Sequence, residues 1–329
     1  MTQADDPTTP AAGHGGGLKL GILLWSQATD WAAFADAARR VDELGYDHLW
    51  TWDHLYAIFG DPRQPIFEGY TALAGLAFAT RRTRLGLLVG ANTFRNPGLV
   101  AKSIATIDHL SEGRAILGLG GAWFGAEHEA FGIDFGSGFG ERLDRMEEAL
   151  VILRGLLDGQ AVTRHGPTYE TRDLVCAPLP VQAHLPIMIG GSGERKTLRS
   201  VALHADMWNG MGSLELMRHK VDVLREHCAA VGRDPAEIEF SLGCKLTIRD
   251  SEAEAERVWQ EAMAHNRTPL SDVEDDETFW RGTSEQLAER LKPYVELGFR
   301  TVISEQPAPY DVETLERFIG EVKPLVERS

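Results

Sequence analysis

Cysteine, cationic side chains and long apolar runs are scarce in this chain of 329 residues, and each scarcity excludes a class of protein. Cys176, Cys228 and Cys244 stand far apart, with no Cys-x-x-Cys pair and no zinc-type Cys/His spacing, so we expect neither a disulfide framework nor a metal site. Sparse thiols are typical of a reducing compartment, which favours the cytoplasm. No run of about 18 apolar residues occurs, which predicts no membrane span.

Positive charge is also in deficit. The chain has 33 lysine and arginine residues against 49 aspartate and glutamate residues, and its formal net charge is −16. A surface of this sign repels nucleic acid and anionic membranes at long range, so we expect neither as a partner. A locally positive site for an anionic small molecule remains compatible with this charge.

The sequence predicts one domain. Residues 1–17 are polar and rich in Gly, Pro and Thr, without the cationic start and apolar centre of a signal peptide. We therefore expect a disordered tail over 1–17 and a single catalytic domain over 18–329.

Short apolar runs alternate with helical patterns through this domain. Strands are expected at 18–25, 46–52, 84–90, 114–120, 186–191, 205–209, 238–248 and 300–304. Helices are expected at 30–44, 70–80, 97–110, 141–157, 194–204, 214–231, 284–297 and 312–326. Eight strands, each followed by a helix, predict an α/β fold, the (β/α)8 TIM barrel. Continuous apolar strands are typical of a parallel sheet buried on both faces, and an open doubly wound sheet is the alternative.

Three segments interrupt this alternation and are interpreted as insertions. They lie at about 121–139, 160–185 and 265–283, and the second contains two β-like pieces joined by a Gly-Pro turn, which indicates a hairpin. In TIM barrels the chemistry lies at the C-terminal ends of the strands. That rule selects Trp25, Ser26, Asp53, His54, 90–95, 120–124, 190–195, 208–210, Lys245, Thr247, Glu305 and Gln306 as candidates.

Four stretches of the chain resemble the luciferase-like monooxygenase superfamily, and within it the branch of oxidoreductases that use the deazaflavin coenzyme F420. They are 45–55 (GYDHLWTWDHL), 83–123, 140–159 and 185–209. Each motif alone is weak, but four in order at strand ends are specific. The resemblance implies a TIM barrel with the cofactor in its mouth, a small-molecule substrate and a homodimer.

The Asp53-His54 pair after the second strand is the signature of the deazaflavin branch. The resemblance implies that His54 is the catalytic acid or base, with Asp53 orienting it or binding the cofactor. A deazaflavin carries a hydride, and hydride transfer builds charge on the substrate that a group titrating near neutral pH relieves. The alternative is that His54 is an ordinary interior histidine.

Cofactor contacts are expected from two further strand ends. The resemblance implies that Leu88, Val89, Gly90, Ala91 and Asn92 lie against the ring. It places a cis peptide at Leu88–Val89 or Val89–Gly90 and pairs Asn92 with the pyrimidine edge of the ring. The resemblance also implies cofactor contacts by Gly121, Ala122 and Trp123, which follow the fourth strand. The alternative for residues 89–92 is a plain turn.

A glycine-rich loop after the fifth strand is the candidate phosphate site. It contains Gly190, Gly191, Ser192, Gly193 and Arg195, and it opens a helix whose free N–H groups suit an anion. Arg195 or Lys196 would supply positive charge, and a plain helix cap is the alternative.

Aromatic side chains at the strand ends predict a hydrophobic substrate pocket formed by Trp25, Trp123, Phe124 and Trp208. Trp123 stands where some relatives have a catalytic glutamate, and Glu127 and Glu129 lie further along. Residues 210–214 (GMGSL) stand where the sugar-phosphate branch has a phosphate-anchoring lysine, so the resemblance disfavours glucose 6-phosphate as substrate.

Three functions follow from these residues. The first is F420-dependent hydride transfer to or from a small, hydrophobic organic molecule. The second is an FMN-dependent monooxygenase of the same fold. The third is a non-catalytic barrel that binds a flavin or deazaflavin.

Overall fold

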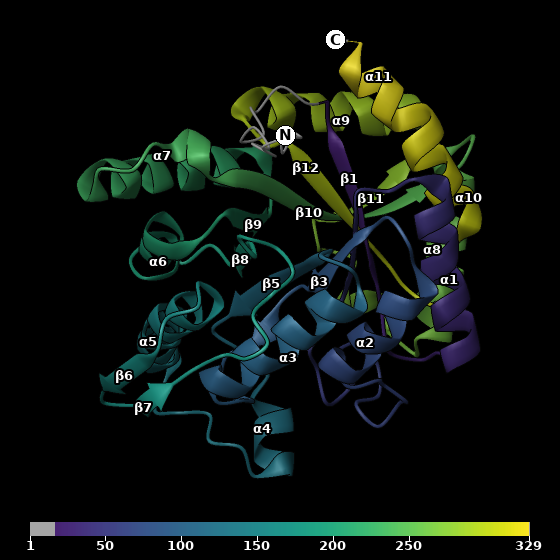
Figure 1. Cartoon of the computed structure of the whole chain (residues 1–329). Helices are drawn as coiled ribbons and strands as arrows, with labels where there is room; N and C mark the ends of the chain where they lie inside the picture. Colours follow the sequence, from purple (N-terminus) through teal and green to yellow (C-terminus); the bar gives the residue numbers. More distant parts are fainter. Residues whose placement is uncertain (1–16, 329) are drawn as a thin grey trace, which may run out of the picture.

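The computed structural model describes residues 17–328, and a barrel of parallel strands forms its centre (Figure 1). The predicted tail over 1–17 lies outside the described residues except for Gly17. The barrel strands are β1 (Lys19–Leu24), β2 (His48–Thr51), β3 (Arg84–Leu87), β5 (Ala115–Gly120), β8 (Ile187–Gly190), β9 (Met207–Met211), β10 (Glu239–Ile248) and β12 (Thr301–Gln306).

Strand pairing closes the barrel. Each of these strands pairs in parallel with the next, and β12 returns to β1 with Lys19 opposite Thr301. β10 joins β9 on one side and β12 on the other. The predicted TIM barrel is confirmed, and the open sheet is excluded because the described strands leave no free edge in this ring.

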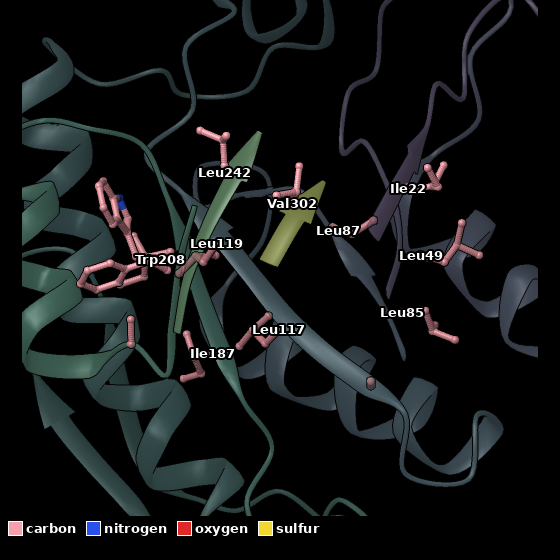
Figure 2. Packing of buried hydrophobic residues seen from close by; sticks show 14 of the residues in the cluster. Ile22, Leu49, Leu85, Leu87, Leu117, Leu119, Ile187, Trp208, Leu242 and Val302 are labelled. Carbon is pink, nitrogen blue, oxygen red and sulfur yellow. The ribbon is translucent and has the colours of Figure 1, made fainter. Parts of the chain in front are cut away.

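Alternate side chains along each strand belong to two separate cores. Leu23, Trp50, Met188 and Ile303 fill the barrel interior. Their neighbours belong to a larger cluster that packs against the surrounding helices, as Figure 2 shows for Ile22, Leu49, Leu117, Ile187 and Val302, among others. Burial on both faces explains why these strands read as continuous apolar runs.

Helices between consecutive strands form the outer layer. They are α1 (Trp31–Leu44), α2 (Gly69–Ala79), α3 (Pro97–Leu110), α5 (Phe139–Leu157), α6 (Thr197–His204), α7 (Leu214–Val231), α9 (Ser284–Leu297) and the closing run α10 (Val312–Arg317), η3 (Phe318–Val322) and α11 (Lys323–Glu327). Local signals set their ends: Asp30 accepts a hydrogen bond from the Ala33 N–H, and Gly45 ends α1 at a φ of 86°.

The segments between strands contain more structure than the sequence predicted. α4 (Gly125–Phe131) lies within the loop expected at 121–139, and β11 (Phe279–Gly282) ends the loop expected at 265–283. Two short strands are additions to the ring: β4 (Gly90–Ala91) pairs with β5, and β11 pairs with the second half of β10. The expected hairpin is present as β6 (Val162–His165) and β7 (Glu170–Leu174). Two 3-10 turns, η1 (Pro235–Glu237) and η2 (Leu270–Asp272), complete the elements.

Helix α8 (Glu252–His265) departs from the layer pattern. Its Trp259 and Met263 pack with the interior residues of the barrel, together with Val273 and Phe279. The outer position beside α7 and α11 is taken by α9 instead. α8 and β11 therefore cover part of the C-terminal mouth of the barrel, where the candidate site lies.

Candidate active site

Three strand ends that the sequence selected meet at the side chain of Val89. The Leu88–Val89 peptide bond is cis, as the resemblance implied. A Cβ added at Gly120 or Gly190 would lie 2.6 Å or 2.9 Å from a Val89 methyl carbon. Glycine at both positions therefore lets the chain after β3 reach across the ends of β5 and β8, which brings the predicted cofactor segments together.

His54 is held by a residue that the sequence did not predict. Its Nδ1 lies 3.0 Å from Oε1 of Glu127, which is 1% exposed and lies on α4. The other carboxylate oxygen accepts a hydrogen bond from the Leu55 N–H at 2.8 Å. Because a carboxylate only accepts, Nδ1 of His54 donates, and Nε2 has no hydrogen-bond partner within residues 17–328.

Asp53 does not contact the His54 side chain, as one of the two expected roles required, and binding of the cofactor by Asp53 stays a prediction. Its carboxylate forms a bidentate ion pair with Arg95, at 2.7 Å and 2.9 Å, and accepts the Ala91 N–H at 2.9 Å. Arg95 also pairs with Glu68 and stacks over the Tyr70 ring. Burial opposes the charge on Arg95, but the two carboxylates outweigh burial and raise its pKa. Asp53 therefore fixes the bulge after β3, and no contact joins it to His54 within residues 17–328.

Aromatic rings surround His54. The Trp123 and Phe124 ring centroids lie 5.6 Å and 6.2 Å from the imidazole, and that of Trp52 lies 6.3 Å away. Trp123 is 62% exposed, an unusual degree for tryptophan, so its indole is available to a ligand. Trp123 and Phe124 thus lie beside His54, and a substrate pocket formed by them stays a prediction.

The predicted phosphate loop has backbone N–H groups and one guanidinium group without partners within the described residues. Within the described residues, the backbone N–H groups from Ser192 to Glu194 have no acceptor, and Arg195 has no ion-pair partner. Lys196, in contrast, is paired with Asp144 at 2.6 Å. Of the two predicted cations, Arg195 is the one free to meet an anion.

Asn92 is buried at the edge of the same region. Its backbone N–H bonds to the Gly120 carbonyl, and its side-chain amide donates to the Tyr169 hydroxyl at 3.4 Å. The hairpin that carries Tyr169 therefore contacts the segment predicted to face the cofactor ring. Gly121 is buried and Ala122 adopts a φ of 59° beside it.

Two predicted pocket tryptophans lie elsewhere. Trp208 is wrong as a pocket residue: it is fully buried between barrel and helices, packs on Phe240 and Phe299, and donates its indole N–H to the Gly191 carbonyl (Figure 2). Trp25 does point into the barrel but is also fully buried, stacked on Phe59 at 4.2 Å.

Neither of two sizeable cavities includes His54 or the glycine loop. One, of about 970 Å³, lies between α1 and residues 308–312. The other, of about 410 Å³, lies under α8. Within residues 17–328 no helix is both long and apolar enough to cross a bilayer.

Comparisons with known proteins agree with this geometry. An F420-dependent glucose-6-phosphate dehydrogenase from Kineococcus radiotolerans is 28% identical over 95% of this chain and 98% of its own length. An FMNH2-dependent dimethylsulfone monooxygenase from Pseudomonas putida is 27% identical over 76% of this chain and 67% of its own. A solved F420-dependent secondary alcohol dehydrogenase, in complex with an F420-acetone adduct, covers 94% of this chain and 99% of its own, with a TM-score of 0.81 at 18% identity.

The family assignment comes from the sequence itself. Residues 9–301 match the profile of luciferase-like monooxygenases, which is most of the chain. The chain belongs to the luciferase-like monooxygenase family.

Proposed function

We propose that this protein is an F420-dependent oxidoreductase that transfers a hydride between the deazaflavin and a small, apolar organic substrate. The observation that carries the proposal is the imidazole of His54, held by Glu127 at the strand end beside Trp123. The full-length similarity to F420-dependent dehydrogenases supports the choice of cofactor.

The residues present suit an anionic tricyclic cofactor. The unpaired Arg195 and the free N–H groups of Ser192 and Gly193 are donors for a phosphate group. Glycine at 120 and 190 lets the Val89 side chain pack across the ends of β5 and β8, which fixes the bulge against which a flat ring would lie. When bound, the deazaflavin supplies a hydride-carrying ring carbon.

Glu127 and His54 handle the proton. Glu127 fixes the imidazole so that Nε2 accepts a proton from a substrate alcohol or, once protonated, donates one to a carbonyl oxygen. Trp123 and Phe124 exclude water on one side and favour an apolar substrate. Asp53 and Arg95 position the segment around Ala91 and take no proton.

Titration of the purified protein with each cofactor tests the proposal. We expect micromolar binding of F420 and no comparable binding of FMN, followed through the quenching of cofactor fluorescence. FMN binding alone would favour the monooxygenase, which the similarity to the FMNH2-dependent enzyme supports as the second candidate. Cofactor binding without turnover of any alcohol or ketone in a broad panel would favour the non-catalytic barrel.

A homodimer and a cytoplasmic location stay predictions. Light scattering of the purified protein measures the first, and fractionation of the native cell measures the second.

A further inference from the structure

The cavity under α8 has the size and lining of a small-molecule site. It measures about 410 Å³ and is bounded by β10, β11, β12 and α8. Trp259, Ala262 and Phe279 give it apolar walls. Ligand pockets of roughly 300–1,000 Å³ with apolar walls and a few polar groups are the usual form of a binding site.

Two charged side chains supply the polar groups. Lys245 and Glu305 face each other in the register of β10 and β12, so both project from the same face of the barrel wall, and both line the cavity. They are 6% and 8% exposed. A polar pair this deeply buried is costly to maintain unless its hydrogen-bonding capacity is used.

One of the two carboxyl oxygens of Glu305 has no hydrogen-bond partner within residues 17–328. Its Oε2 accepts the Trp25 indole N–H at 3.0 Å. Its Oε1 has no partner within residues 17–328, yet it is not among the sealed, unsatisfied atoms of that range, so it stays reachable. Burial raises the pKa of Glu305, which favours a carboxylic acid that can both donate and accept.

The cavity has no unpaired cation to offer an anion. Lys245 donates to Thr278 Oγ1 at 2.8 Å and pairs with Asp276 at 3.3 Å. Its third N–H faces only the Met211 sulfur, at 4.0 Å, so its charge is matched by Asp276 while one donor remains for a neutral group. Arg249, the other lining cation, is paired with Asp311 and Glu313. Because the remaining charged groups in the lining are carboxylates, a phosphate or carboxylate ligand would be repelled.

A chain of rings connects this cavity to His54. Trp25, bonded to Glu305, has its ring centroid 4.8 Å from that of Trp52, and Trp52 in turn lies 6.3 Å from the imidazole. The cavity and the proposed reaction site are therefore neighbours in the same barrel mouth, separated by tryptophan side chains.

We propose that this cavity is a binding site of its own for a neutral, apolar molecule that carries a hydroxyl or carbonyl group, with Lys245 and Glu305 as its hydrogen-bonding partners. A hydroxyl oxygen accepts from Lys245 and donates to Glu305, and a carbonyl accepts from both. Binding itself requires no cofactor, so the two proposals fail separately.

The test uses the cofactor-free protein with its tryptophan indoles labelled with ¹⁵N. Cyclohexanol and cyclohexanone are the neutral probes, and cyclohexanecarboxylate at neutral pH is the anionic one. We expect both neutral probes to move the Trp25 and Trp259 indole signals in a saturable way, whereas the carboxylate leaves them in place. Trp25→Phe and Trp259→Phe assign the signals among the eight tryptophans.

Variants locate the binding. Lys245→Met and Glu305→Leu should each weaken binding of cyclohexanol by about tenfold or more. Glu305→Gln, which keeps a donor and an acceptor, should retain most of the affinity, so that the loss in the leucine variant is assigned to the missing hydrogen bonds. Lys245→Met carries the test if the leucine variant fails to fold. Glu239→Gln, at the opposite end of β10, is the matched control and should bind as the wild type does.

Three results would overturn the proposal. They are the absence of saturable shifts with both neutral probes, tighter binding of the carboxylate, and unchanged affinity in both Lys245→Met and Glu305→Leu, or in Lys245→Met alone if the leucine variant does not fold.

Discussion

Two histidines six positions apart, His48 and His54, stand at opposite ends of the same barrel wall. His48 begins β2 at the N-terminal end, is 3% exposed and has no acceptor for Nδ1 within the described residues. Burial lowers its pKa to about 4, so it is neutral at pH 7. His54 follows β2 at the C-terminal end, where a buried carboxylate holds it. The same residue type is a packing group at one end and a candidate proton carrier at the other.

The buried glutamates at the two ends of the barrel, Glu239 and Glu127, differ in the same way as the two histidines. Glu239, at the N-terminal end, is paired with Lys19 and Thr301, which are structural partners of neighbouring strands. Glu127, at the C-terminal end, orients a side chain that faces the mouth. Both carboxylates are hydrogen-bonded, but Glu239 bonds to structural partners, whereas Glu127 bonds to an imidazole whose other nitrogen has no partner within residues 17–328.

The largest expected effect separates the two histidines directly. His54→Ala should lower turnover by about 10²- to 10⁴-fold, because the substrate oxygen loses its proton donor or acceptor. Deazaflavin affinity and thermal stability should stay close to wild type. His48→Leu is the matched control and should keep its turnover; equal losses in the two variants would refute the assignment.

Removing Arg95 should damage stability more than any nearby change. Arg95→Met leaves the fully buried Asp53 carboxylate without its cation, at a cost of about 3–5 kcal/mol in the free energy of unfolding. Urea denaturation measures it. The double variant Arg95→Met/Asp53→Asn should regain much of the loss, since no uncompensated charge remains.

Acid should destabilise the protein through His48. Its pKa is about 4 in the folded chain and about 6.5 in the unfolded chain, so the unfolded state binds the proton first as the pH falls. Stability from this group is constant above pH 6.5 and falls by about 3 kcal/mol between 6.5 and 4. Urea denaturation at pH 7, 5.5 and 4 should show a steeper fall for wild type than for His48→Leu. Parallel curves would contradict this account.

Glu127→Gln should lower turnover by about tenfold while the fold persists. An amide can donate as well as accept, so it no longer fixes which nitrogen of His54 carries the proton. The ¹⁵N spectrum of the imidazole should show a single tautomer in the wild type and a mixture in the variant. An unchanged tautomer would remove Glu127 from the positioning role.

The smallest effect is expected at the glycine loop. Arg195→Ala should weaken deazaflavin binding several-fold, and more strongly at low salt, because an exposed charge is screened by ions. Arg199→Ala, which breaks only a surface pair with Glu147, is the control. Equal affinities for Arg195→Ala and the wild type would leave the loop as a plain helix cap.

The sequence predicted the strands and the residues at their ends more reliably than it predicted their contacts. Asp53 and His54 were found because they follow an apolar run, and Leu88–Val89 because of a resemblance. Glu127 was noticed but not assigned, since it is 73 positions from His54 and only the packing of α4 brings them together. Arg95 lay within a candidate segment, but nothing in the sequence pairs it with Asp53.

Trp208 shows the physical limit most clearly. In a strand buried on both faces, apolar residues follow one another without alternation, so the pattern does not reveal which side chain points inward. Met207 joins the barrel interior and Trp208 the outer layer. A helical pattern also does not reveal where the helix packs. The sequence therefore did not indicate that α8 covers the mouth of the barrel.

The sequence by itself determined the barrel, through the order of apolar runs and helical periods, and it determined which residues stand at the strand ends. Only the tertiary structure decided that Glu127 orients His54, that Arg95 neutralises Asp53 and that Lys245 and Glu305 share a cavity. Periodicity is a local property of the chain, whereas each of these pairs joins residues separated by 42 to 73 positions, whose meeting depends on strand register and ring closure.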